Sequence, residues 1–535
     1  MRDPDGAPWP GLVVEARQSR PLGASVVLAS GVTDAEGRYR LAFAPTLAGA
    51  LLRPDLRAAI MDKRGVRTLA QVPARDGAPS EIVLPRGEVE GWSATLGTGE
   101  PSRVSTGNDA RLLVDAPEAF GPMLDAIAQA RSRVLLMQFL LRDDFTPATG
   151  EGTLLEALRA AAARGVNVRV LLNANVFGLD DVKRTRAALD GASNVQVAGL
   201  TMQPGVQHAK ALIVDDAHAF LVGMPFQQRF WDTRQHAVLD ARRGKPQPNH
   251  DTALELRGPI VREIGSLLAR LWSLEADPLP PPPREQPRAG NATMQVTRTL
   301  PSGILGEARE RGCLEAHLRA LSQAKHFLYH ENQYFTSRAI TKAVARALDA
   351  APGLDIILLL NEATDAPTYT ATQRSRLASL GEKPNLGLFT AWSVGELNGK
   401  RGLAPVYVHS KVAIADDAWA MTGSANLDGF GLEGAAEIGL RRALSIELNV
   451  SVLDGADGHA PCGLAARMRQ DLWAEQLGLP ARELATPPPG GWLALWRRVA
   501  QENLARVQAG DLRLQGHVLP LGAKIPRALR LPIRP

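Results

Sequence analysis

The chain has 535 residues, which is enough for about three domains with large hydrophobic cores. Its content of 45% hydrophobic and 22% charged residues is that of an ordinary globular protein, which sets aside disordered and fibrous classes. The net charge of +5 suits an anionic substrate, although charge alone indicates only a mixed, solvated surface, and the two cysteines, Cys313 and Cys462, suggest no disulfide framework.

The start of the chain and its hydropathy predict a protein without membrane-spanning helices. No apolar run approaches the length of about 18 residues that a transmembrane helix requires. The first residues, MRDPDGAPWPG, lack the apolar core of a signal peptide. We therefore expect a cytoplasmic protein, and secretion by a leaderless route stays open.

The first 90 residues have a pattern of short strands and turns that differs from the remainder. In GVTDAEGRYRLAF a turn is expected at 34–37, followed by a half-buried strand with apolar residues at Tyr39, Leu41 and Phe43. SVVLAS (25–30) and EIVLP (81–85) are further strand-like runs. The string TDAEGRYRL resembles carboxypeptidase-regulatory and transthyretin-like modules, which implies a small all-β sandwich over 1–90. No catalytic group is visible there, so we expect this segment to dock on a partner or to act as a spacer.

From about residue 92 onward the chain repeats itself. IAQARSRVLLMQ (127–138) aligns with LSQAKHFLYHEN (321–332), and LLEALRAAAARGVNVRVLLN (154–173) aligns with ITKAVARALDAAPGLDIILLLN (340–361). The second pair reads as an amphipathic helix, a glycine-containing break and an apolar strand, which is the βαβ pattern of a parallel sheet. A closing helix with a tryptophan follows in each half, at 262–272 and at 468–477.

These repeats predict an α/β fold with two related α-β-α lobes, 91–276 and 294–485, that pack about a pseudo-twofold axis. The connector between them, 277–293, begins DPLPPPPREQPRAG, and its consecutive prolines favour an extended polyproline conformation. The final segment, 486–535, is expected to hold a helix at 492–509 and a basic tail.

The repeat that carries chemistry is a His-x-Lys-x4-Asp string. It occurs as QHAKALIVDD (207–216) and as VHSKVAIADD (408–417), so the motif residues are His208, Lys210, Asp215, His409, Lys411 and Asp416. Side chains two apart on a strand share one face, so the His and Lys of each string point the same way. The Asp stands where the strand ends, and we expect it to brace neighbouring strands. Two such His/Lys pairs at one point fit an anionic group that is held by the lysines and attacked by one histidine.

The two strings resemble the duplicated signature of the phospholipase D superfamily. The second copy continues into GSAN (423–426), as the family's does. HENQYF (330–335) resembles the family's I-E-N-Q-Y-F stretch, and VTRTLP (296–301) resembles the opening of its second lobe. In the first lobe, AFLVG followed by FWDTRQH resembles the family's A-F-V-G-G … W-D-T … H run. The resemblance covers roughly 95–480, which is most of the chain.

The resemblance implies a phosphohistidine mechanism. One motif histidine attacks phosphorus, and the other protonates the leaving alcohol and later activates water or an acceptor alcohol. By resemblance the nucleophile is His208 and the general acid and base is His409, while Lys210 and Lys411 neutralise the phosphate oxygens. Hydrogen bonds to the same group are expected from Ser424 and Asn426. No metal or other cofactor is implied, because the lysines supply the positive charge that Mg²⁺ provides in other phosphoryl transfers.

A nucleophilic histidine also needs an acceptor on its other ring nitrogen, and the family takes an acid from a later strand for this purpose. Asp251 in HDTALELRG and Glu447 in SIELNVSVLDG stand at matching places before the two closing helices. Glu437 in AAEIGL is the alternative in the second lobe.

The first lobe departs from the family pattern after its motif, where GMPFQQ (223–228) replaces G-S-x-N. Met224, Pro225 and Phe226 cannot supply the missing hydrogen bonds, and Gln227 or Gln228 is a candidate to replace them. The remaining histidines of this region follow no metal-ligand spacing and are expected to be structural or solvated: His218, His236 and His250.

The first hypothesis for function is a phospholipase D that hydrolyses the headgroup phosphodiester of phospholipids, with headgroup exchange onto alcohols as a variant. On the same scaffold, the alternatives are a cardiolipin-synthase-like phosphatidyltransferase and a nuclease or general phosphodiesterase. Family cardiolipin synthases usually carry N-terminal membrane helices, and family nucleases usually have a single motif and dimerise. A non-catalytic binding protein is the alternative from another class, and both complete His/Lys pairs argue against it.

The expected partner is a phospholipid membrane surface rather than a nucleic acid, and the chain is expected to be a monomer whose two lobes form one site. Residues 362–405 are expected to form a long loop that caps the site. The helix at 492–509 is the candidate for membrane contact.

Overall fold

The computed structural model describes most of the chain beyond the N-terminal region. The described residues are 13–18, 26–32, 34, 55–62, 65–73, 91–94, 103–147, 152–175, 177–202, 205–305, 309–433 and 445–533. Among them, no helix combines the length and the hydropathy needed to cross a bilayer.

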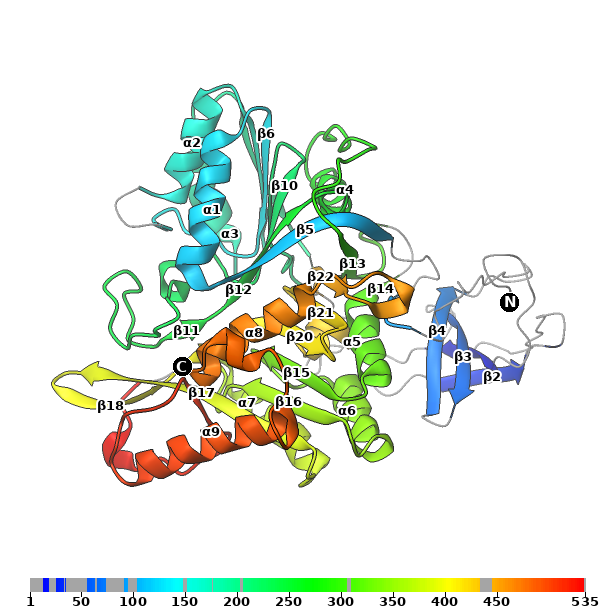
Figure 1. Ribbon diagram of the computed structural model, residues 1–535. Helices are drawn as coiled ribbons and strands as arrows, with labels where there is room; N and C mark the ends of the chain where they lie inside the picture. The colour runs from blue at the N-terminus through cyan, green and yellow to red at the C-terminus, as the bar shows by residue number, and fades with distance from the viewer. Residues whose placement is uncertain are drawn as a thin grey trace.

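The N-terminal region contains an antiparallel four-stranded sheet in the order β2-β1-β3-β4, which lies to one side of the remaining chain (Figure 1). Its strands are β1 (Val13–Gln18), β2 (Val26–Val32), β3 (Asp55–Asp62) and β4 (Gly65–Pro73). Strand β2 falls on the run SVVLAS. The strands expected at 39–43 and 81–85 lie outside the described residues, so the sandwich stays a prediction.

The first lobe is a mixed sheet in the order β8-β7-β6-β9-β10-β12-β5, in which β6, β7 and β8 are parallel and the others antiparallel. Its strands are β5 (Val104–Val114), β6 (Arg133–Gln138), β7 (Asn167–Asn173), β8 (Val195–Leu200), β9 (Ala211–Val214), β10 (His218–Val222) and β12 (Thr252–Arg257). Its helices are α1 (Asp115–Gln129), α2 (Leu154–Ala163), α3 (Leu179–Ala188) and α4 (Ile260–Trp272). Helix α2 begins at a capping box in which Thr153 and Glu156 satisfy each other's backbone N–H groups.

The second lobe repeats this order as β17-β16-β15-β20-β21-β22-β13. Its strands are β13 (Ala292–Leu300), β14 (Glu310–Arg311), β15 (Phe327–Asn332), β16 (Asp355–Leu360), β17 (Leu386–Leu397), β18 (Lys400–Pro405), β20 (Lys411–Ala415), β21 (Trp419–Gly423) and β22 (Glu447–Leu453). Its helices are α5 (Gly312–Gln323), α6 (Arg338–Ala350), α7 (Pro367–Leu380) and α8 (Leu464–Leu477). The matching strand orders confirm the predicted α/β fold with two related lobes.

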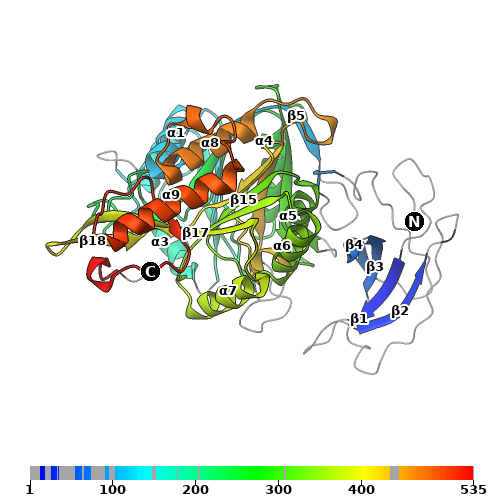
Figure 2. The same cartoon turned by 60° about the horizontal axis from the view of Figure 1, so that its bottom comes forward.

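Two expectations about the second lobe were wrong. The segment 362–405 is not a long loop, because it forms α7 and an antiparallel hairpin of β17 and β18. The C-terminal helix α9 (Gly491–Gln508) is not free to lie on a membrane, because its apolar side chains are buried, among them Trp492, Trp496 and Val499. Figure 2 shows α9 lying across the strands of this lobe, and β23 (Val518–Pro520) adds to β17.

The two lobes are joined by strands and helices that cross between them. Strand β5 pairs antiparallel with β13, α4 packs against β13, and α8 packs against β5. Both tryptophans of the closing helices, Trp272 and Trp473, lie in one hydrophobic core that spans the two lobes. The lobes are therefore held in a fixed relative orientation by buried apolar surface, which gives a composite site between them a stable frame.

Candidate active site

The two motif histidines lie where the lobes meet, each just before the strand that carries its motif. At each one a short cross-lobe β contact fixes the backbone. The N–H of His208 donates to the carbonyl of Ile446 at 3.0 Å, and the N–H of His409 donates to the carbonyl of His250 at 2.8 Å. The second contact belongs to a parallel two-stranded sheet of β11 (Asn249–His250) and β19 (Tyr407–Val408). The residue after each accepting carbonyl, Glu447 and Asp251, is a predicted acid, so these contacts bring each acid to the opposite lobe.

Each histidine is held by the carboxylate of the other lobe. The Nδ1 atom of His208 lies 2.9 Å from Oε2 of Glu447, and the Nδ1 atom of His409 lies 2.6 Å from Oδ2 of Asp251. Both predicted acids therefore meet a histidine, but each meets the histidine of the other lobe and not the one that it follows in its own lobe. Because Nδ1 is occupied in both rings, Nε2 is the atom left for chemistry.

Burial and nearby charge keep both imidazoles neutral around pH 7. Burial lowers the pKa of His208 well below its ordinary value, and the charges of Lys210 and Lys411 lower it further. Burial and the charge of Lys411 lower the pKa of His409 to about 4. A neutral imidazole with a free Nε2 lone pair is the form that attacks phosphorus.

The two acids differ in charge. Burial alone would raise the pKa of Asp251, but its pairing with His409 and the charge of Lys411 bring that pKa below its ordinary value. Burial raises the pKa of Glu447 to about 8, against the charge of Lys210 and a hydrogen bond from Ser424. Asp251 is thus a carboxylate that accepts the His409 Nδ1–H, whereas Glu447 keeps its proton to a higher pH than an ordinary glutamate.

The two motif lysines are buried cations, and neither forms an ion pair with a carboxylate in the part of the chain that the structure describes. The Nζ atom of Lys210 donates to the carbonyl of His208 at 2.8 Å, and that of Lys411 donates to Oε1 of Gln333 at 3.2 Å and to the carbonyl of His409. Burial lowers the pKa of Lys210 to about 7 and that of Lys411 to about 8. Buried ammonium groups that lack a counter-ion favour an anionic ligand such as a phosphodiester.

The two predicted hydrogen-bond donors from the GSAN string are both buried next to this site. The hydroxyl of Ser424 donates to Oε2 of Glu447 at 2.6 Å and accepts from the N–H of Leu448 at 3.0 Å. Oδ1 of Asn426 is buried without a hydrogen-bond partner among the described residues. Ser424 therefore braces Glu447 in this structure, and the phosphate contacts of both residues stay predictions.

In the first lobe, Gly223 occupies the place of Ser424. The N–H of Gly223 donates to the carbonyl of Thr252 at 2.9 Å, just as the N–H of Ser424 donates to the carbonyl of Leu448 at 3.0 Å. Oδ1 of Asp251 lies 2.3 Å from the point where a Cβ atom of residue 223 would stand, so no side chain fits there. The departure noted in GMPFQQ therefore makes the two lobes differ: Glu447 accepts a hydrogen bond from the Ser424 hydroxyl, whereas residue 223 has no hydroxyl to offer Asp251.

The glutamines that were candidates to replace the missing donors lie further along the same loop. Oε1 of Gln228 accepts the N–H of Thr146 at 3.1 Å, and Gln227 is buried. A phosphate contact by either residue stays a prediction.

The motif aspartates lie at the far ends of their strands and brace the backbone there. The carboxylate of Asp215 accepts the N–H groups of Arg131, Ser132 and Arg133 at 2.8–3.0 Å, at the start of β6. The carboxylate of Asp416 accepts three N–H groups in the same way at the start of β15. Neither carboxylate hydrogen-bonds to a motif histidine or lysine, as expected for residues that brace strands.

We expect the substitution Asp215→Ala to lower the free energy of unfolding by about 2 kcal/mol, because it removes a charged acceptor of several backbone hydrogen bonds. The hydrogen bonds from Ser132 and Arg133 outweigh burial and lower the pKa of Asp215. Its stabilisation is therefore present at neutral pH and is lost as the pH falls below the ordinary aspartate pKa of about 3.9.

Urea unfolding of the wild type and of Asp215→Ala at pH 7 and at pH 3 tests this expectation. Asp215→Asn serves as the matched control, since it keeps one acceptor oxygen and tolerates the positive φ of 53° at this position. An equal stability difference between wild type and Asp215→Ala at both pH values would contradict the assignment.

Several residues near the site were not found from the sequence. The ring of Phe139 lies 4.9 Å from that of His208, and the ring of Phe230 lies 4.9 Å from that of His409. Gln333 stands in the HENQYF string, whose resemblance to the family could have identified it.

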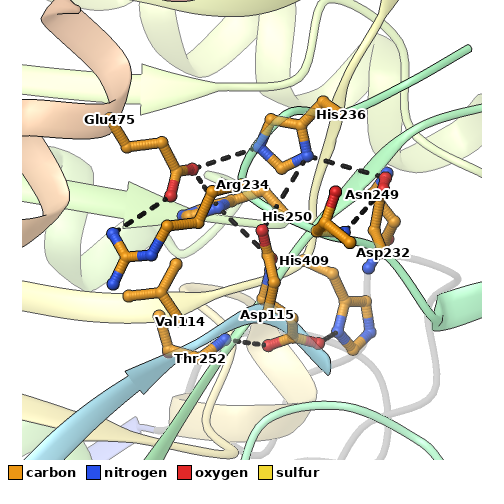
Figure 3. Close-up of polar contacts among 12 residues, drawn as sticks. Val114, Asp115, Asp232, Arg234, His236, Asn249, His250, Thr252, His409 and Glu475 are labelled. Carbon is orange, nitrogen blue, oxygen red and sulfur yellow. Dashed lines mark hydrogen bonds and ion pairs between the residues drawn. The ribbon is translucent and has the colours of Figure 1, made fainter. Parts of the chain in front are cut away.

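A buried cluster next to His409 was also missed (Figure 3): Asp115, His236, His250 and Glu475. Glu437 lies outside the described residues, and His218 is a structural residue that pairs with Glu255 at 2.9 Å.

Comparison with known proteins decides the family. The sequence profile described as "Cardiolipin synthase, PLD-like domain" matches residues 123–239 and 317–444, which include His208 and His409. The chain belongs to the phospholipase D superfamily. This confirms the resemblance drawn from the two motifs.

The relatives of this phospholipase D-superfamily enzyme are synthases. It is 27% identical over 363 residues to cardiolipin synthase A of Pseudomonas aeruginosa, an alignment that covers 65% of this chain and 66% of that protein. It is 25% identical over 373 residues to cardiolipin synthase B of Escherichia coli K12, covering 65% of this chain and 77% of that protein. Thus the chain spans 66% of the length of the Pseudomonas relative. Among solved structures, phosphatidylserine synthase of Haemophilus influenzae Rd KW20 aligns at 12% identity and a TM-score of 0.47, over 76% of this chain and 95% of that chain.

Proposed function

We propose that the chain is a phosphatidyltransferase: it cleaves the headgroup phosphodiester of a phospholipid and transfers the phosphatidyl group to an acceptor alcohol. The observation that carries the proposal is the pair of neutral, cross-braced histidines beside two buried lysines. Its support for transfer over hydrolysis comes from the relatives, which are named cardiolipin synthases. The preference for hydrolysis drawn from the sequence alone is replaced by the alternative that was kept beside it.

In the first step, Nε2 of His208 attacks phosphorus and a P–N bond forms while the P–O bond to the headgroup breaks. When the phosphodiester anion binds, its charge and that of Asp251 raise the pKa of His409, which takes up a proton from solvent on Nε2. The leaving alkoxide takes this proton. Lys210 and Lys411 neutralise the nonbridging oxygens as negative charge develops on them.

In the second step, Nε2 of His409 takes the proton of the acceptor hydroxyl. The acceptor oxygen attacks phosphorus, the P–N bond breaks, and His208 is returned as neutral imidazole. Water and an alcohol both fit this step, so hydrolysis is the second candidate. The specific observation that favours hydrolysis is the likeness of HENQYF to the corresponding stretch of family phospholipases.

The deciding experiment is a product analysis with vesicles of phosphatidylglycerol and phosphatidylcholine in the presence of EDTA. Transfer onto a phosphatidylglycerol hydroxyl gives cardiolipin and glycerol, whereas hydrolysis gives phosphatidic acid, and mass spectrometry separates the products. Cardiolipin made by the wild type but by neither His208→Ala nor His409→Ala supports the proposal. Phosphatidic acid alone would move the assignment to a phospholipase D, and cleavage of DNA or bis(p-nitrophenyl) phosphate without lipid turnover would overturn both lipid assignments.

A further inference from the structure

A buried ion cluster lies directly behind His409, at the junction of the two lobes (Figure 3). From the first lobe it contains Asp115 at the start of α1, His236 from a loop, and His250 of β11. From the second lobe it contains Glu475 of α8. All four side chains are at most 2% exposed, so their charges must be compensated within the protein.

The geometry favours imidazolium ions over a metal in this cluster. His236 directs Nε2 to Oε1 of Glu475 at 3.1 Å and Nδ1 to Oδ2 of Asp232 at 3.5 Å. His250 directs Nδ1 to the same Glu475 oxygen at 2.9 Å and Nε2 to Oε1 of Glu331 at 3.4 Å. In each ring Nε2 is hydrogen-bonded to a carboxylate and Nδ1 lies within 3.5 Å of a second carboxylate, an arrangement that favours the doubly protonated ring. A metal ion would engage only one nitrogen of each ring.

The pKa directions agree with this geometry. Burial alone would lower the pKa of His236, but Asp115, Asp232 and Glu475 raise it to about 10. Burial likewise opposes protonation of His250, and Glu475 and Glu331 raise its pKa well above the ordinary value. Two buried cations thus lie near Asp115: Nδ1 of His250 is 3.6 Å from its Oδ1, and Nδ1 of His236 is 3.9 Å from its Oδ2.

Asp115 holds Asp251 by two reciprocal hydrogen bonds. The N–H of Asp115 donates to the carbonyl of Asp251 at 2.9 Å, and the N–H of Asp251 donates to Oδ1 of Asp115 at 3.0 Å. Asp251 is the residue whose carboxylate holds His409. One residue therefore fixes both backbone polar groups of the acid that orients the general acid and base.

The two lobes differ at this place, and the difference explains why Asp115 is needed. In the second lobe, the hydroxyl of Ser424 braces Glu447 directly. In the first lobe, the corresponding Gly223 has no side chain and no room for one. Asp115 also adopts a left-handed backbone conformation with φ of 59°, which is unfavourable for most residues and is tolerated best by asparagine and aspartate apart from glycine. Backbone strain of this kind, in a buried residue that contacts the site, points to function.

We propose that Asp115 is a positioning residue, next to the imidazolium groups of His236 and His250, that sets Asp251 and thereby His409 in place for proton transfer through its two hydrogen bonds to the Asp251 backbone. For its activity measurements this inference rests on the proposed phosphatidyl transfer. It places Asp115 in no direct contact with substrate.

The test compares Asp115→Ala with Asp115→Asn. Alanine removes the side-chain acceptor and disfavours the left-handed conformation, whereas asparagine keeps both Oδ1 and that conformation. With phospholipid substrate we expect Asp115→Ala to lower kcat by about 10²-fold at little cost in KM, since proton transfer by His409 is lost. We expect Asp115→Asn to retain most of the wild-type kcat.

A phosphodiester of p-nitrophenol separates positioning from general damage. Its leaving group departs without a proton, so Asp115→Ala should release about one nitrophenol per site in a burst at the wild-type rate. The slow steady state that follows reports the second step, which still needs His409 as base. Equal losses in the burst and in the steady state, or equal impairment of the alanine and asparagine variants, would show a merely structural role and overturn the inference.

A measurement without substrate keeps the inference independent of the proposed function. The Nδ1 proton of His409, in a 2.6 Å hydrogen bond, should give a downfield NMR resonance that is absent in His409→Asn. It should be lost in Asp115→Ala and kept in Asp115→Asn. Its persistence in Asp115→Ala would overturn the inference even if the enzyme turned over no lipid. One tightly bound metal equivalent in the wild type that is missing in Asp115→Ala would overturn the imidazolium account.

Discussion

Replacing His208 by alanine should abolish phosphodiester cleavage, with a loss of kcat on the order of 10⁴-fold or more, because no other group can form the covalent intermediate. Replacing His409 by asparagine should give a similar loss on phospholipids. The two losses should nevertheless differ in kind, because His409 moves protons and His208 carries the phosphoryl group. The measurement is rapid quench of each variant with a p-nitrophenyl phosphodiester.

In His409→Asn the first step needs no proton for this leaving group, whereas the second step lacks its base. A phosphohistidine should therefore accumulate on His208, stable in alkali and labile in acid, and peptide mass spectrometry should locate it. His208→Asn is the control and should form no adduct. An adduct on His409 in His208→Asn, and none on His208 in His409→Asn, would exchange the two roles. The lowered pKa of Asp251 and the raised pKa of Glu447 make this assignment worth testing, since they give the two histidines unequal surroundings.

The second large effect is expected from the lysines. Lys210→Met and Lys411→Met should each lower kcat/KM by about 10²–10³-fold, the usual cost of removing one group that stabilises charge in the transition state. Methionine fills a similar volume without charge. Lys183→Met is the matched control, because Lys183 is exposed on α3 and should leave kcat/KM unchanged. A loss below tenfold in both buried variants would contradict their role as phosphate ligands.

The same lysines predict the pH dependence of the wild type. Burial lowers their pKa values to about 7 and about 8, so the free enzyme loses these cations as the pH rises through that range. We therefore expect kcat/KM to fall above pH 7 to 8. Bound phosphate restores the charged form, so kcat should persist to higher pH than kcat/KM. Identical alkaline limbs for the two parameters would show that the lysines do not titrate in the free enzyme.

The chemistry of the site was readable from the sequence because strand geometry is local. A His and a Lys two residues apart must share a face, and the doubled string placed two such pairs in related lobes. Asp251 and Glu447 were recognised by their matching positions. Which histidine each acid serves was not readable, because it depends on how the lobes dock, and the docking surface is built from residues scattered over both halves.

The remaining differences have similar physical causes. Asp115, His236, His250 and Glu475 are far apart in sequence, and only the crossing of α1, β11 and α8 brings them together. Spacing rules for metal ligands look for short intervals, and an ion cluster assembled from two helices, a strand and a loop has none. The hairpin of β17 and β18 was missed because residues 362–405 alternate too weakly to be recognised as strands, although their backbone hydrogen bonds are made in the folded chain.

The exchange of carboxylates between the lobes has a mechanical consequence. A small rigid rotation of one lobe would lengthen the His208–Glu447 and His409–Asp251 contacts together, so both reaction centres would fail at once. Loosening of the junction would therefore impair nucleophilic attack by His208 and proton transfer by His409 together, and not one step alone. In this respect the two lobes depend on each other like the subunits of a homodimer. Any substitution that shifts the lobe interface should therefore affect both His208 and His409.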